Sequence, residues 1–334
     1  MNKVDHHVRF SNTLRLLEMQ NKDDASPQST MVLTREIAET LICDNESIHA
    51  NEYTSINEDA AVLIGASGKL LFLDGLKTLP ADLATVLSTK STIISLNGLL
   101  TLDDETAKVL GKSNDSLYLC GLTSLSVVAA SEIAKVTGSE LFLDGLPTIS
   151  EDVATSLARF QGERESTLSL DGLTKISAVV AAELKNHRGW LSLQGLTDIS
   201  DDAALQLGKH DGENLYLSSV DNLSDAAIQS LAHHSHSVWF GNLPEDQKNR
   251  FEEMVELKKF MEFAWYARYV FQIVPSLNGL PQCATNMDEL VEELQSGLDC
   301  DDVVYRTRQL RDLLNRLDLT LPAKSIFIET WKIR

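Results

Sequence analysis

The sequence predicts an α/β solenoid, in which short parallel strands alternate with short helices. The hexapeptide LFLDGL occurs at Leu71–Leu76 and again, unchanged, at Leu141–Leu146. Weaker copies stand between and after these two, and a helix-like stretch follows each copy. The glycines of the copies are spaced by 23, 23, 24, 27 and 23 residues, which is a typical solenoid period. They are Gly75, Gly98, Gly121, Gly145, Gly172 and Gly195.

Each unit has the pattern LxLxGLxxISxxxAxxL, which specifies a strand, a turn and a helix. The two leucines of LxL point to the same side of a strand because side chains alternate with period two. We expect the glycine to let the chain turn sharply at the strand's end. Ser150, Ser200 and Ser224 are expected to cap the helices, with acidic residues just inside, where the helix dipole favours them. Stacked units then bury the apolar stripe that one unit leaves exposed.

The repeat frame predicts three regions of the chain. About nine strands are expected in a solenoid over residues 47–244, ending with the strand Val238–Leu243. Residues 1–46 are predicted to hold an N-terminal cap helix and one orphan repeat helix. Residues 245–334 lose the repeat and are predicted to form a mainly helical domain that caps the solenoid.

The repeat resembles the leucine-rich repeat family, and is most similar to its cysteine-containing subtype, LxxLxLxxCxxITDxxLxxL. The cysteine position holds leucine here, at Leu76, Leu99, Leu122 and Leu146, and the period is a few residues shorter. GL-containing repeats of this kind occur in bacterial proteins of the family. The resemblance covers about 200 residues. It implies a parallel sheet on a concave side, helices on a convex side, and a role in binding that the architecture alone does not specify.

The residues between the leucines are expected to form columns on the concave sheet, with strands about 4.8 Å apart. The column three residues before each glycine position contains His49, Phe72, Ser95, Tyr118, Phe142, Ser169, Ser192, Tyr216 and Trp239. A polar column beside it contains Asn51, Asp74, Asn97, Cys120, Asp144, Asp171, Gln194, Ser218 and Gly241. Trp190 adds a large ring on a third column. The predicted partner-binding residues are Phe72, Tyr118, Phe142, Trp190, Tyr216, Trp239, Asp74, Asp144 and Asp171.

The same columns can also be interpreted without a bound partner. Aromatic residues favour strands and pair across them without binding anything else, and the chain's own terminal segments could cover the rings. Asp144 and Asp171 could hold a cation, although neighbouring carboxylates on a sheet are more often only solvated. His233, His234 and His236 could bind a transition metal, but surface histidines near a helix end explain them better.

Composition limits the classes of partner. The 334 residues carry a net charge of −20, so the surface repels phosphate, and nucleic acid or an anionic membrane is excluded as a partner. A protein or peptide, basic in character, is favoured instead. The sequence shows no signal peptide and no span long enough to cross a bilayer, and its four cysteines have no CxxC spacing. We therefore expect a cytoplasmic protein with reduced thiols.

Catalytic motifs are not found. The sequence has no GxxxxGK[ST], HExxH or GxSxG and no zinc-type cysteine pairing, so we expect neither an enzyme nor a cofactor. The predicted function is a non-enzymatic scaffold that binds a protein or peptide on its concave face, with the C-terminal helical domain as cap and second interface. The alternative is a regulatory or effector protein whose activity lies in residues 245–334, where the amphipathic basic stretch Arg306–Arg316 is one candidate docking helix.

Overall fold

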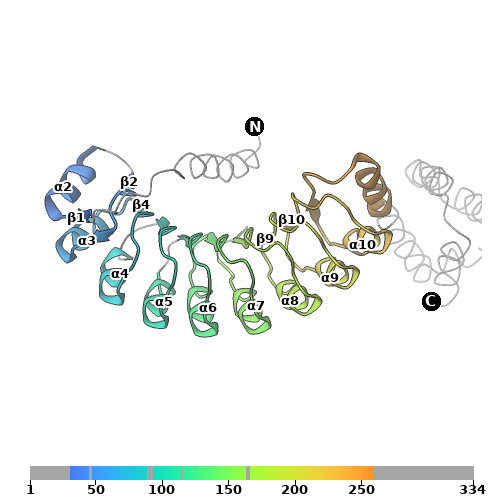
Figure 1. The fold of residues 1–334 in the computed structure, drawn as a ribbon, viewed down its shortest axis with the longest axis horizontal. Coiled ribbons are helices and arrows are strands. Elements are labelled where there is room, and N and C mark those ends of the chain that lie inside the picture. The colour runs from blue at the N-terminus through green and yellow to red at the C-terminus, as the bar shows by residue number, and fades with distance from the viewer. Residues whose placement is uncertain are drawn as a thin grey trace, which may run out of the picture.

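The computed structural model describes residues 31–258, apart from 45–46, 89, 91–92, 114–115, 163–165 and 257. The predicted cap helix in residues 8–20, the basic stretch 306–316 and nearly all of the predicted C-terminal domain lie outside the described residues. The described chain has an α/β fold with a nine-stranded parallel sheet in the order β11-β10-β9-β8-β7-β6-β5-β4-β2. Figure 1 shows the strands stacked along the inner side of an arc and helices α4 to α10 along its outer side.

The strands are short and in register, so equivalent positions of successive repeats lie side by side. Leu117 pairs with Leu141, and Leu141 with Leu168. The strands of the large sheet are β2 (Ser47–His49), β4 (Leu70–Phe72), β5 (Ile93–Ser95), β6 (Ser116–Tyr118), β7 (Glu140–Phe142), β8 (Thr167–Ser169), β9 (Trp190–Ser192), β10 (Asn214–Tyr216) and β11 (Ser237–Trp239). A two-stranded sheet pairs β1 (Val32–Leu33) with β3 (Ser55–Ile56). The nine strands of the large sheet agree with the predicted number, but the last strand is Ser237–Trp239 where the sequence predicts Val238–Leu243.

One helix follows almost every strand. The helices are α2 (Arg35–Asp44), α3 (Glu58–Gly65), α4 (Ala81–Leu87), α5 (Asp104–Leu110), α6 (Val127–Ile133), α7 (Glu151–Leu157), α8 (Ala178–Leu184), α9 (Asp201–Leu207) and α10 (Asp225–Leu231). Residues 245–256 are also helical. The predicted N-caps are confirmed, because the hydroxyls of Ser150, Ser200 and Ser224 each accept a hydrogen bond from the backbone N–H three residues later. Among the described helices, none has the length and apolar character needed to span a membrane.

The core is a continuous stack of leucine and alanine side chains that runs between the sheet and the helices. Leu71 and Leu73 of one repeat are both fully buried, as are their equivalents Leu141 and Leu143. Ala84 and Ala154 are fully buried on the inner faces of their helices, where a small side chain lets each helix approach the sheet. Each buried leucine contributes about 1.5–3 kcal/mol, so stability accumulates through contacts between neighbouring repeats.

The repeated glycines lie in the predicted turns at the strand ends, but the turns do not use a positive φ, and the glycines are needed there for close packing between coils. Among the described glycines, only Gly68 has a positive φ. A Cβ atom added to Gly98 would lie 2.0 Å from the backbone oxygen of Asp74, and one added to Gly172 would lie 2.1 Å from that of Asp144. Each glycine therefore lets its loop pack directly on the backbone of the preceding repeat.

Candidate functional site

The candidate site is the concave face of the sheet, where strand register places the predicted column in one line. Cα pairing joins Phe72 to Ser95, Ser95 to Tyr118 and Tyr118 to Phe142. The same register continues through Ser169, Ser192, Tyr216 and Trp239. We call this line, from His49 to Trp239, the concave column. Its position on the sheet is as the sequence predicts.

The rings of the concave column occur in neighbouring pairs that stack on one another. His49 stacks on Phe72 with centroids 4.6 Å apart, and Tyr118 stacks on Phe142 at 4.8 Å. Tyr216 stacks on Trp239 at 6.4 Å. Serines separate the three pairs, so the column is interrupted between β4 and β6 and again between β7 and β10. The cross-strand pairing that the sequence left open as an alternative therefore accounts for part of the aromatic content.

Tyr118 is buried, so the prediction that its ring is exposed on the concave face is wrong. Its side chain is 7% exposed, packs against Phe142, and donates a hydrogen bond from its hydroxyl to Glu140 Oε2. Burial, followed by the negative charge of Glu140, raises the pKa of Tyr118 far above its usual value. Tyr118 is therefore a neutral structural residue that joins two adjacent strands.

The carboxylates of the polar column are engaged inside the protein. Asp171 Oδ1 accepts hydrogen bonds from Ser192 Oγ at 2.7 Å and from the backbone N–H of Gln194 at 2.8 Å. Asp144 Oδ1 accepts equivalent bonds from Ser169 Oγ at 2.6 Å and from the backbone of Asp171 at 3.1 Å. These residues form a ladder that connects each coil to the next. Binding a partner is therefore not needed to explain them.

A sequence signal for this ladder existed but was missed. Each aspartate of the polar column is followed, one repeat later, by a serine in the concave column: Asp74 by Ser95, Asp144 by Ser169 and Asp171 by Ser192. Asparagine at the same position is followed by an aromatic residue, and the side-chain oxygens of Asn51 and Asn97 accept a hydrogen bond from the backbone N–H of the next coil. An ionised carboxylate accepts more bonds than an amide oxygen, and the serine hydroxyl supplies the extra donor.

One group of predicted residues does form a connected, accessible patch, at the C-terminal end of the sheet. Trp190 lies 6.3 Å from Tyr216, and Tyr216 lies 6.4 Å from Trp239, measured between ring centroids. Trp190 Nε1 donates to Glu213 Oε2 at 2.9 Å, so the exposed Glu213 carboxylate is held beside the ring. Trp239 is 47% exposed. We call Trp190, Tyr216 and Trp239 the aromatic patch.

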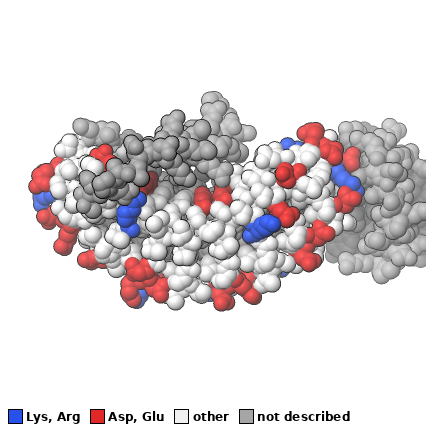
Figure 2. Space-filling model, viewed as in Figure 1, with Lys and Arg blue, Asp and Glu red and all other residues white. Residues whose placement is uncertain are grey.

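The charge around the molecule is predominantly negative. Figure 2 shows Asp and Glu side chains gathered at the two ends of the described chain and along its outer edge, with few Lys and Arg side chains in view. Most helices place these acids in their first turns, as Asp201 and Asp202 do in α9. Negative charge in the first turn interacts favourably with the positive end of the helix dipole. The same acids create a negative surface potential that attracts cationic partners.

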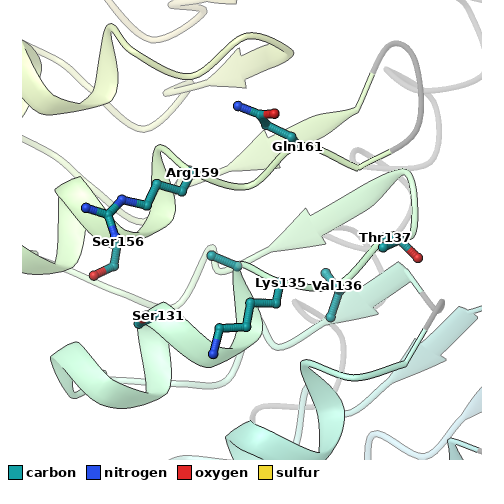
Figure 3. A pocket seen from close by; sticks show the side chains of 8 residues that line it. Ser131, Lys135, Val136, Thr137, Ser156, Arg159 and Gln161 are labelled. Atoms are coloured by element: carbon teal, nitrogen blue, oxygen red, sulfur yellow. The ribbon is translucent and has the colours of Figure 1, made fainter.

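A recess of about 290 Å³ lies away from the concave face, between the C-terminal ends of α6 and α7. Figure 3 shows Lys135 and Arg159, one from each of two neighbouring repeats, extending along this recess. Lys135 Nζ already lies 2.6 Å from Glu132 Oε1, so a carboxylate neutralises one of the two cations. The recess therefore lacks the concentrated positive charge that an anion site requires.

The histidines near residue 234 do not behave as one surface cluster. His233 and His236 are exposed, but His234 is only 3% exposed and packs on His210, so the surface interpretation of His234 is wrong. In the described part of the chain, no three His, Cys, Asp or Glu side chains converge in a way that could hold a metal ion. Neither Cys43 nor Cys120 is in a disulfide, and the thiol of Cys120 donates to Asp144 Oδ2 at 3.7 Å.

Comparison with known proteins adds no identification. No protein-family model matches this sequence, and no curated protein matches it. The function is therefore inferred from the geometry of the concave face and from the charge of the chain.

Proposed function

We propose that this protein is a non-enzymatic interaction module that binds a protein or peptide segment on its concave face. The observation that carries the proposal is the aromatic patch, in which three large rings lie in contact along adjacent strands while Trp239 keeps nearly half of its surface accessible. Tryptophan and tyrosine are the residues most often responsible for binding energy at protein interfaces. The patch replaces the full-length column as the proposed contact surface.

We also propose that the repeats are of the leucine-rich type. Parallel strands on the inner side, helices on the outer side, a period of 23–27 residues and a polar ladder between coils support this assignment. In such an arrangement the helices hold the sheet rigid, so a binding residue on a strand is presented in a fixed position. A rigid surface loses little conformational entropy when it binds a partner.

The proposed partner segment is basic. Glu213 is fixed against Trp190 and lies at the edge of the aromatic patch. A Lys or Arg side chain that reaches this edge would meet a carboxylate and the face of an indole ring together, which favours a cation through both charge and the ring quadrupole. The net charge of −20 acts in the same direction at longer range.

Site-specific crosslinking tests the proposal. Benzoylphenylalanine in place of Trp239 keeps a large ring in the patch and should capture a discrete partner in the native host. The same probe in place of Leu205, a 43%-exposed residue of α9 on the opposite face, is the matched control and should not capture that partner. Equal capture from both positions, or capture from position 205 alone, would refute the concave-face proposal.

Affinity measurements with the captured partner then test the energy of the contact. Trp239→Ala should weaken binding about 30-fold, which corresponds to about 2 kcal/mol for the loss of a central aromatic residue. Leu205→Ala should leave the dissociation constant unchanged. A weakening of less than threefold by Trp239→Ala would show that the aromatic patch is not the contact.

A further inference from the structure

A column of histidines runs through the core of the last repeats. His187, His210 and His234 each stand three residues after the final leucine of a repeat helix, so they occupy the same position in successive coils. Their rings stack, with centroids 6.3 Å apart between His187 and His210 and 5.2 Å apart between His210 and His234. The equivalent position one repeat earlier is Phe160, whose ring stacks on His187 at 6.0 Å.

The histidine column is buried and poorly hydrogen-bonded. The three side chains are 0%, 1% and 3% exposed in chain order. His210 Nδ1 lies 2.9 Å from His234 Nε2, and His234 Nδ1 accepts from the backbone N–H of His236. Neither ring nitrogen of His187, nor Nε2 of His210, has a hydrogen-bond partner of good geometry in the described chain. Neutral rings tolerate such an environment far better than charged ones.

Charged groups close to the column do not compensate a positive charge. Within the column each histidine faces another histidine, and His236 also acts on both His210 and His234. From the C-terminal helical segment, Lys258 Nζ reaches the backbone oxygens of His233 and His234. The exposed chain neighbours on the loops are Arg188, Lys209 and His233, with Asp211 as the one acid among these neighbours. Protonation would therefore place a cation among cations.

Burial lowers the pKa of His187 to about 4 and that of His210 to about 3, and it also lowers the pKa of His234. Backbone groups of Phe160 and Trp190 raise the pKa of His187 but do not offset its burial. In the unfolded chain these groups titrate near 6.5. Above about pH 6.5 the histidines are neutral in both the folded and the unfolded state, so their protonation does not affect folding stability. Between about pH 6.5 and pH 4 the unfolded state binds more protons than the folded state, so the free energy of unfolding decreases as the pH is lowered.

The N-terminal repeats lack this sensitivity. In earlier repeats the equivalent position holds the exposed Lys90, then Ser113, Val136 and Phe160, so none of these repeats places a histidine there. In a solenoid each coil contacts only its neighbours, so a destabilised end can open while the remainder stays folded. Residues 184–243 include all three histidines, and they also carry Trp190, Tyr216 and Trp239.

We propose that residues 184–243 form an acid-labile end of the solenoid that opens before the earlier repeats, disperses the aromatic patch and releases a bound partner. The release step rests on the proposed function, whereas the opening does not. Relative to pH 7.5, protonation of His187 at pH 5 favours the open state about 30-fold, and protonation of His210 does the same. Together the two histidines favour the open state several-hundredfold.

Hydrogen exchange of the full chain, resolved by mass spectrometry, tests the opening. After correction for intrinsic exchange rates, peptides from residues 184–243 should lose several-hundredfold protection between pH 7.5 and pH 5.0. Peptides from residues 93–160 should change far less, and they correct for acid effects common to the whole chain. Equal loss in the two regions, or none in residues 184–243, would overturn the inference.

Two variants separate the histidine column from other acidic effects. His187→Phe removes a ring without a well-formed hydrogen bond and continues the stack from Phe160, so it should reduce the acid effect about 30-fold. His233→Gln replaces an exposed neighbour and should change nothing. An unaltered acid effect in His187→Phe would overturn the assignment.

The two proposals can fail separately. Hydrogen exchange needs no partner, so a negative exchange result leaves the concave-face proposal standing. A negative crosslinking result at position 239 leaves the proposed opening standing.

Discussion

Replacement of Asp171 tests whether the polar ladder holds the coils together. Asp171 is 8% exposed, and its carboxylate accepts hydrogen bonds from Ser192 Oγ at 2.7 Å, from the Gln194 backbone at 2.8 Å and from Gln194 Nε2 at 3.2 Å. Asp171→Ala leaves the Ser192 hydroxyl and the Gln194 N–H without an acceptor in a site that admits little water. An unsatisfied buried donor costs about 1–3 kcal/mol. We therefore expect Asp171→Ala to lower the free energy of unfolding by about 3 kcal/mol.

Urea titration followed by circular dichroism measures this loss. With a slope of about 3 kcal/mol per molar urea, the midpoint should fall by about 1 M. Asp171→Asn is the matched variant, because Asn97 at the equivalent position accepts the next backbone N–H at 2.8 Å. The asparagine variant should lose about 1 kcal/mol, since it keeps an acceptor but loses the charge that strengthens the bonds. If alanine and asparagine were equally destabilising, or if alanine cost under 1 kcal/mol, the ladder would not hold the coils in this way.

Two further predictions concern the backbone of the repeat. In Gly145→Ala the new methyl group would lie 2.2 Å from the backbone oxygen of Cys120, so the two coils must separate. The free energy of unfolding should fall by about 3 kcal/mol. Thermal unfolding measures this loss, and an unchanged midpoint temperature would contradict the prediction. Ser200→Ala removes the acceptor for the Ala203 N–H and should cost about 1 kcal/mol in the same assay, whereas a loss near zero would mean that water replaces the cap.

Most of the fold could be predicted because it depends on short-range, repeated constraints. The LxL pattern, the capping serines and the buried alanines each act within one unit, and the period shows how the units stack. Leu71 and Ala84 are buried as their positions require. The role of the glycines could not be predicted in the same way, since a glycine that permits a turn and one that permits close packing look identical in sequence. The structure distinguishes the two, because a Cβ atom added to Gly172 would lie 2.1 Å from the backbone oxygen of Asp144.

The candidate site was harder to predict because exposure depends on neighbours in the next coil. Tyr118 and Trp239 occupy equivalent positions, yet one is buried against Phe142 and Glu140 while the other is open. The carboxylates look like a partner surface in the sequence because their serine donors lie one repeat away. In the sequence, His234 looks like one of a local group with His233 and His236. Its buried partners His210 and His187 lie one and two repeats earlier, so only the repeat spacing connects them.

The two identical hexapeptides show that coils of this chain are interchangeable parts. Excision of residues 71–140 would join Leu70 directly to Leu141, and the six residues after the junction would read as before. Leu141 would inherit the place of Leu71, and Gly145 that of Gly75 against the carbonyl oxygen of residue 51. A gene that duplicates or loses whole multiples of this unit can thus lengthen or shorten the arc without having to evolve a new joint between its pieces.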